Sequence, residues 1–201
     1  MTRHVPKSTT RSSQVLSFED ALESSEEGQL NYDPKKWVYV PNSYDEYRYI
    51  LGTKGNNPLI VIGANPSTAA PDNLDPTLKS AQRIAKSNGY DSFLMLNVYP
   101  QRSTDPKLME KDVNEFLLGE NIKAFEYTLT LSPSKDIWCA WGNVIENRDY
   151  MKKGVRLEIG AGNKLGANWL CAGEVLKSGN PHHPLYLKAD TKLNPFSPAI
   201  D

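Results

Sequence analysis

Four apolar segments of this sequence each run into a loop whose polar side chains are suited to chemistry. The loops read Gly63-Ala64-Asn65-Pro66, Asn97-Val98-Tyr99-Pro100, Trp141-Gly142-Asn143 and Asn180-Pro181-His182-His183-Pro184. An asparagine side chain offers both a donor and an acceptor, so it can read the edge of a pyrimidine base. A histidine donor can stabilise the negative charge that grows on a departing base. The prolines make these loops stiff, which suits a preformed pocket.

Each of these residues also has a purely structural interpretation. Asn65 before Pro66 is typical of a turn, and Asn97 is typical of a strand end whose side chain bonds its own loop. The histidines of the last loop fit an ordinary surface segment, and Trp141 with Gly142 fits core packing. The chemical interpretation depends on all four loops meeting in one place.

The elements that must position these loops alternate along the chain. Strands are expected at 59–62, 93–99, 136–142 and 168–173, and helices after Asp75-Pro76, after Thr104-Asp105-Pro106, over 121–131 and over 143–158. In the second of these helices, Leu108, Val113, Phe116 and Leu117 form the expected apolar side. This alternation predicts a three-layer α/β sandwich with a four-stranded, mostly parallel central sheet. Ligands bind beyond the carboxyl ends of such strands, so we expect the four loops to converge at one edge.

The N-terminal part of the chain differs in composition from the rest. Residues 1–35 predict a flexible arm that is partly disordered, and residues 36–201 predict a single α/β domain. Within the arm, the stretch SFEDALESSEEGQ predicts a short acidic helix with Ser17 as its cap. The stretches KKWVYV and EYRYILG predict short strands that extend the sheet.

Composition excludes several classes of protein. The chain has 201 residues and a formal charge of −1, so no overall positive field indicates a nucleic acid partner, although basic residues can gather on one face. No apolar run approaches the ~20 residues that span a bilayer, and the N-terminus lacks the apolar centre of a secretory signal. A cytoplasmic location is therefore expected. Cys139 and Cys171 lie in apolar segments and are expected to be buried thiols, too few for an iron–sulfur cluster.

The order of the motifs GANPS, LMLNVYPQR, WCAWG and HPLYL is similar to that of the uracil-DNA glycosylase superfamily. The chain also resembles an uncharacterised prokaryotic domain family with the motifs NPSTA, DPT, TDP, WG and HPLYL, over about residues 47–190. The first resemblance implies a glycosylase-like fold without metal or cofactor, and DNA as the partner. The protein would excise a modified or damaged pyrimidine, or uracil itself, in DNA repair or in defence against foreign DNA.

The glycosylase resemblance also implies roles for single residues. Asn65 would position the attacking water, and Asn97 would bond the Watson–Crick edge of an extruded base. His183 would stabilise the negative charge on the departing base, although the loop can also be registered with His182 in that place. Leu185 would be the wedge that fills the gap left in the duplex.

The remaining candidates concern substrate choice and DNA binding. Ser67 stands where efficient uracil-specific members carry a bulky aromatic residue, so it leaves space for a substituent at pyrimidine C5. Tyr99 is the candidate for stacking on the base, and Arg102, Arg148 and His182 are the candidates for contacts with the DNA.

Two other functional classes fit the same residues. One is a hydrolase of free modified nucleosides or nucleotides, which needs neither a wedge nor a basic track along DNA. The other is a non-catalytic sensor of nucleic acid or nucleotides, which the convergent asparagine and histidine set disfavours.

Overall fold

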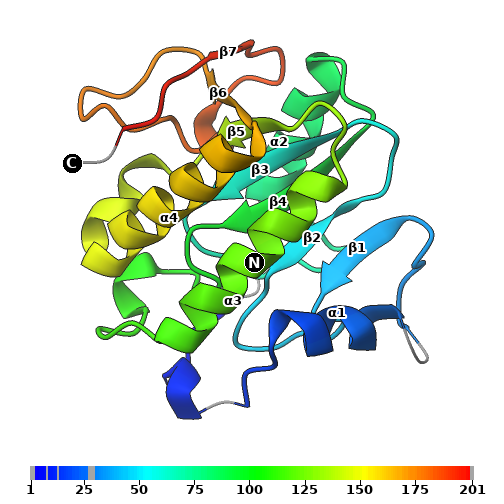
Figure 1. Cartoon of the computed structure of the whole chain (residues 1–201), viewed down its shortest axis with the longest axis vertical. Helices are drawn as coiled ribbons and strands as arrows, with labels where there is room; N and C mark the ends of the chain where they lie inside the picture. The colour runs from blue at the N-terminus through cyan, green and yellow to red at the C-terminus, as the bar shows by residue number, and fades with distance from the viewer. Residues whose placement is uncertain (1–2, 8, 13, 27–29, 200–201) are drawn as a thin grey trace.

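The computed structural model describes residues 3–7, 9–12, 14–26 and 30–199. Within these residues it has one sheet of seven strands in the order β1-β2-β4-β3-β5-β6-β7 (Figure 1). The strands are β1 (Trp37–Val40), β2 (Ile50–Thr53), β3 (Pro58–Gly63), β4 (Ser92–Asn97), β5 (Asp136–Cys139), β6 (Asn168–Ala172) and β7 (Leu193–Pro195). The α-helices are α1 (Phe18–Glu26), α2 (Pro76–Ser87), α3 (Glu115–Thr130) and α4 (Asp149–Leu165), and the 3₁₀ helices are η1 (Thr10–Ser12), η2 (Pro106–Leu108), η3 (Gly142–Asn147) and η4 (Pro184–Tyr186).

The centre of the sheet is parallel. Strand β3 pairs in parallel with β4 on one side and with β5 on the other, and β6 continues the parallel set. Strands β3 and β4 are buried along their whole length, as expected for strands covered on both faces. Antiparallel β1, β2 and β7 complete the two sides, so the sheet has seven strands where the sequence predicted a four-stranded core with a short N-terminal extension.

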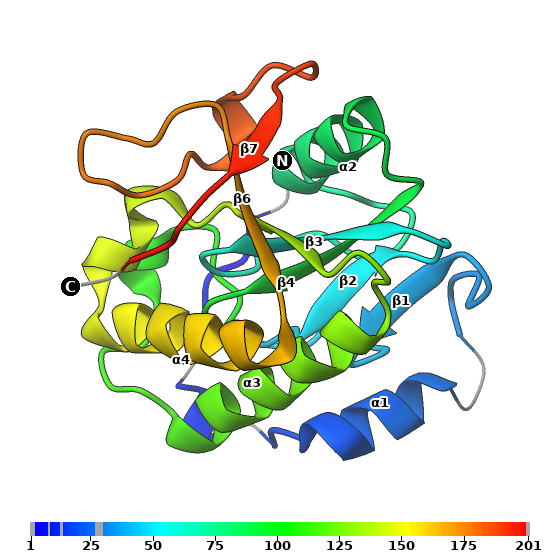
Figure 2. The same cartoon turned by 45° about the horizontal axis from the view of Figure 1, so that its top comes forward.

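Helices cover both faces of the sheet (Figure 2). Leu78, Ala81 and Ile84 of α2 pack on one face, against side chains such as Leu59 and Val61 of β3. Helices α1, α3 and α4 pack on the other face, where Ile60 and Ile62 point. The α/β class and the parallel centre predicted from the sequence are therefore confirmed.

One expected helix does not form where the sequence placed it. Asp105 and Pro106 open only η2, and α3 begins later, where the Asn114 side chain accepts the N–H of Leu117. The predicted helix from Thr104 and the predicted helix over 121–131 are thus replaced by one turn and a single long α3. The cap signal was correct, but Leu108 and Phe116 are exposed, so no continuous apolar face supports a helix through that turn.

The described residues of the N-terminal arm contact the domain. The backbone N–H and hydroxyl of Thr10 both donate to the buried Glu110 carboxylate. Helix α1 begins at Phe18, and Ser17 caps it as predicted, since its hydroxyl accepts the N–H of Asp20. The N–H of Phe18 donates to Glu120 of α3. Two carboxylates of the domain thus accept backbone N–H groups of the arm. Residues 1–2, 8, 13 and 27–29 lie outside the described part.

Two further expectations concern cysteines and membranes. Cys139 and Cys171 are free and buried, as predicted from their apolar segments. Among the described residues, no helix has the length and apolar character needed to cross a membrane.

Candidate functional site

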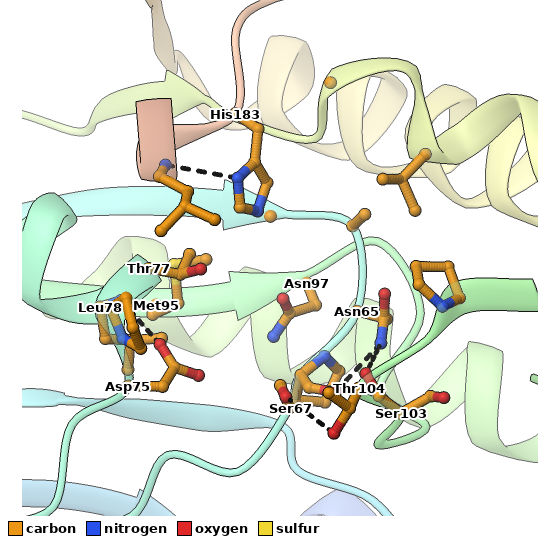
Figure 3. A pocket seen from close by; sticks show the side chains of 18 of the residues that line it. Asn65, Ser67, Asp75, Thr77, Leu78, Met95, Asn97, Ser103, Thr104 and His183 are labelled. Atoms are coloured by element: carbon orange, nitrogen blue, oxygen red, sulfur yellow. Dashed lines mark hydrogen bonds between the residues drawn. The ribbon is translucent and has the colours of Figure 1, made fainter. Parts of the chain in front are cut away.

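A cavity of about 990 Å³ opens at the carboxyl ends of β3 and β4. Its wall includes Gly63 at the end of β3, Asn97 at the end of β4, and the η4 loop at His183 (Figure 3). Six of the residues with a functional role predicted from the sequence line it: Asn65, Ser67, Asn97, His182, His183 and Leu185. The loops that follow the strands meet there because parallel strands bring their carboxyl ends to one edge.

The side chain of Asn65 is held in one orientation. Its Nδ2 donates to the carbonyl oxygens of Pro66 at 3.0 Å and of Ser103 at 2.9 Å. With the nitrogen engaged on that side, Oδ1 faces the cavity (Figure 3). The site therefore presents a fixed acceptor there, which suits a water molecule or a sugar hydroxyl.

Asn97 lies deeper, with 1% of its surface exposed. Neither its Oδ1 nor its Nδ2 has a hydrogen-bond partner in the described part of the chain. A buried amide without partners costs about 1–3 kcal/mol, so both atoms are available to a ligand that satisfies them. A Cβ at Gly63 would lie 2.9 Å from Asn97 Oδ1 and 2.5 Å from Met95 Cε, so the glycine that ends β3 makes room for these side chains.

His183 presents a donor to the same cavity. Its Nδ1 accepts the backbone N–H of Leu185 at 3.3 Å, so in the neutral ring the proton is on Nε2, which points into the cavity (Figure 3). Burial lowers the pKa of His183 from its ordinary value, and the charge of Asp75 opposes this shift. The ring is therefore neutral at pH 7, with one fixed N–H donor.

Gly142 explains the Trp-Gly motif. Its φ of 60° is in the left-handed region, and a Cβ there would lie 3.3 Å from His183 Cβ. The glycine thus lets the His183 loop approach the end of β5. Trp141 is 1% exposed and belongs to the core, as its structural interpretation predicted.

Ser67 and Leu185 lie toward the mouth of the cavity. The hydroxyl of Ser67 lies 3.5 Å from that of Thr104, and Leu185 is 40% exposed. Tyr186 next to Leu185 is 84% exposed and also lines the cavity, so the rim carries an aromatic side chain that the sequence did not single out.

Tyr99 does not lie where a base could stack on it. Its side chain is fully buried on the α3–α4 face, where its hydroxyl donates to Glu110 and accepts the N–H of Asn114. The chain leaves β4 after Asn97, so the alternation that would have placed residues 97 and 99 on one face is broken. The prediction that Tyr99 stacks on a base is therefore wrong, and Tyr99 has a structural role.

Arg102 and Arg148 are also engaged inside the protein. Arg102 is fully buried and donates to the carbonyls of Ser67 and Ala69 and to the hydroxyl of Tyr39. Arg148 donates to the backbone carbonyls of Lys107, Met109, Glu110 and Asn147. Neither side chain lines the cavity, and Arg102 is closed to a DNA phosphate. Both arginines hold loops together, in contrast to the predicted phosphate contacts.

The sequence interpretation missed three charged residues of the cavity, Arg48, Asp75 and Lys79. Asp75 was identified only as a helix cap, and its Oδ1 does accept the N–H of Leu78, but the residue also lines the cavity. Arg48 lines it as well and is fully buried. Arg48 lies between Tyr47 and Tyr49, whose side chains both belong to the core under α3 and α4. Because side chains alternate along an extended chain, this pattern could have indicated that Arg48 points to the opposite face of the sheet.

Fold and cavity together define an α/β protein with a cavity at the carboxyl edge of a mixed sheet, lined by polar, charged and apolar side chains. A family model described as "Protein of unknown function (DUF1643)" matches residues 48–185, more than half of the chain, so the protein belongs to that family. No curated protein and no solved structure matches it. The matched region contains every residue of the cavity discussed above except Tyr186.

Proposed function

We propose that this protein hydrolyses the N-glycosidic bond of a modified or damaged pyrimidine in DNA and leaves an abasic site. The observation that carries the proposal is Asn97, a buried amide with two unpartnered polar atoms in the cavity that also holds Asn65 Oδ1 and His183. A pyrimidine edge offers the complementary acceptor and donor. The resemblance to uracil-DNA glycosylases, carried by the motifs at Asn65, Asn97 and His183, supports the same chemistry.

In the proposed reaction the target base leaves the helix stack and enters the cavity against Asn97. The bond between the base nitrogen and sugar C1′ breaks, and its electron pair stays on the base. The Nε2–H of neutral His183 donates to the base oxygen on which this charge gathers. Water placed by Asn65 Oδ1 forms the new bond to C1′ and gives its proton to the departing base or to solvent.

The residue types in the cavity fit an enzyme that is slow and that accepts bases with substituents at C5. An asparagine is no general base at neutral pH, so Asn65 can orient water but cannot deprotonate it. Ser67 is small and leaves the cavity open where a large ring would exclude substituents at C5. Modified pyrimidines are therefore the proposed substrates in preference to plain uracil.

Incubation with oligonucleotides that carry uracil, 5-hydroxymethyluracil or other C5-modified pyrimidines tests the proposal. Abasic sites are then revealed by alkaline cleavage on a gel. We expect cleavage at a modified base, and loss of cleavage in Asn97→Leu, which removes both polar atoms and keeps the volume. Absence of cleavage on every oligonucleotide, single-stranded or duplex, would contradict the proposal.

A second candidate function is the same hydrolysis on free nucleotides. It is favoured by the engagement of Arg102 and Arg148 within the protein. Among the described residues, Arg48 and Lys79 are the arginine and lysine side chains that line the cavity. Negligible duplex binding at low salt, with release of base from a mononucleotide, would favour this candidate.

A further inference from the structure

Arg48 is a buried cation at the wall of the cavity. Its Nη1 donates to the carbonyl oxygen of Ala69 at 3.3 Å, and this bond orients the guanidinium. Its Nε and Nη2 have no hydrogen-bond partner within the described residues. These two nitrogens lie on one edge of the guanidinium, the edge that pairs with two oxygens of a phosphate or carboxylate.

The charge of Arg48 is offset only in part, by Asp75, which forms no ion pair with it. Arg102 reaches the same carbonyl of Ala69 at 3.1 Å, so two buried guanidiniums share one acceptor. In the part of the chain that the structure describes, no Asp or Glu oxygen lies within 4 Å of either. Burial, and then the charge of Arg102, lower the pKa of Arg48 to about 9, and Asp75 opposes this shift. A bound anion would balance the charge.

We propose that the free edge of Arg48 binds the terminal phosphate of a nucleotide whose base lies against Asn97. This assignment rests on the second candidate function, N-glycosidic hydrolysis of free nucleotides, and names nucleoside monophosphates as its substrate class. The cavity of about 990 Å³ has room for base, sugar and phosphate together.

Burial of Arg48 favours a terminal phosphate over one within a DNA strand. The side chain has no exposed surface, so its free edge is closed to bulk solvent. A phosphodiester continues into a second nucleotide, which would need an open path beyond the arginine. A monoester ends at its phosphate, so no second nucleotide has to fit beyond the arginine. It also carries more negative charge than a diester, which suits a buried cation whose charge is only partly offset.

Calorimetric titration of the full chain tests this subsite. The probes are thymidine and 2′-deoxyuridine, their 5′-monophosphates, and the dinucleotide TpT. We expect each monophosphate to bind about 10-fold or more tightly than its nucleoside, and TpT to bind no better than thymidine. Arg48→Met should remove the preference for the monophosphate and leave nucleoside affinity unchanged. Arg83→Met, which removes an exposed arginine of α2 outside the cavity, should keep the preference.

Three results would overturn the subsite: equal affinity of the wild type for nucleotide and nucleoside, a preference that persists in Arg48→Met, or TpT binding as tightly as thymidine monophosphate. If Arg48→Met does not fold, inorganic phosphate is used as the probe on the wild type. Millimolar phosphate should then raise the melting temperature above that in sodium chloride of equal ionic strength, and no such rise would contradict the subsite.

Failure of the proposed function would look different. Arg48-dependent nucleotide binding without release of free base would remove the hydrolytic proposal and leave the phosphate subsite standing. Cleavage of oligonucleotides without any Arg48-dependent phosphate preference would remove the phosphate subsite and leave the hydrolytic proposal standing.

Discussion

The side-chain nitrogen of Asn65 lies 2.9 Å from the carbonyl oxygen of Ser103 and donates to it, so one end of the amide is fixed and the other faces the cavity. This contact ties the loop after β3 to the loop after β4. It also decides what can replace the asparagine, because the position beside Ser103 requires a donor.

Asn65→Asp should therefore destabilise the protein rather than supply a stronger base. A carboxylate would place an oxygen against the carbonyls of Pro66 and Ser103, which raises its folded-state pKa above the usual ~3.9. Stability should be close to wild type at pH 4 and fall by about 1–3 kcal/mol as the pH rises to 7, because the folded state holds the proton that the unfolded chain releases. Thermal melts at both pH values measure this.

Asn65→Ala provides the control for that experiment. It loses the same hydrogen bonds without introducing a titratable group, so its loss of stability should not depend on pH. Its rate of base release should fall about 10²-fold, as for a lost catalytic contact. An Asn65→Asp variant as stable as wild type at pH 7 would contradict the expected orientation of the amide.

Asn97→Leu should separate stability from activity. The leucine removes a buried amide with no partners, so the free energy of unfolding should stay unchanged or rise by about 1 kcal/mol, while base release should fall at least 10²-fold. Asn121→Leu is the matched comparison, since Asn121 Nδ2 donates to the carbonyl of Asn97 and its loss should lower stability. Denaturant unfolding and an activity assay on both variants check this. A marked loss of stability in Asn97→Leu would show that the amide has a structural partner.

His183 and His182 should differ in their effect on the reaction. His183→Ala should lower kcat about 10²-fold, because it removes the fixed Nε2–H donor. His182→Ala should act mainly on KM. Burial lowers the pKa of His183, so the wild-type rate should stay level near neutral pH. It should fall in acid, where protonation of Nδ1 breaks the contact with the Leu185 N–H that orients the ring. Rates from pH 5 to 8 for all three proteins test this. Equal effects of the two substitutions would remove the assignment to His183.

Ser67→Tyr should change which base is accepted. The phenol ring would occupy space near the mouth of the cavity, so release of a bulky C5-modified base should be abolished while any release of uracil remains. Ser67→Ala serves as control and should leave both activities within a few-fold of wild type. The ratio of the two rates is the measurement, and an equal loss on both bases in Ser67→Tyr would mean that Ser67 does not control access to C5.

Glu158 of α4 should make the folded state sensitive to pH. Its carboxyl group is fully buried without a partner among the described residues, and burial raises its pKa to about 8. The folded state keeps this proton up to about pH 8, whereas the unfolded chain releases it near its ordinary pKa. Stability should therefore fall as the pH rises from 5 to 8, by up to ~1.4 kcal/mol per unit.

Glu158→Gln should flatten that dependence, since the amide is neutral throughout. The exposed Glu115, which pairs with Lys153, gives the control Glu115→Gln, and this variant should keep the slope of the wild type. Melting temperatures at pH 5, 6.5 and 8 compare the three proteins. A wild-type curve that is flat over this range would contradict a buried, protonated Glu158.

Much of the fold could be predicted because its signals are local. A few adjacent residues are enough to indicate the buried strands β3 and β4 and the start of α2 at Asp75-Pro76. The helix expected at Thr104 does not form, because Asp105 and Pro106 can begin a helical turn but only packing of an apolar face extends that turn into a helix. Strand β7 was not predicted, because its three residues depend on pairing with β6.

The sequence by itself determined that Asn65, Asn97 and His183 would share one edge, because alternating strands and helices force parallel strands to end on the same side. Only the tertiary structure decided where long side chains point. The side chains of Tyr99, Arg102 and Arg148 form hydrogen bonds inside the protein. Arg48, which lines the cavity, has two guanidinium nitrogens without a hydrogen-bond partner among the described residues. Chain order fixes where a residue lies in the fold, but the direction of its side chain depends on the donors and acceptors that distant segments bring within reach.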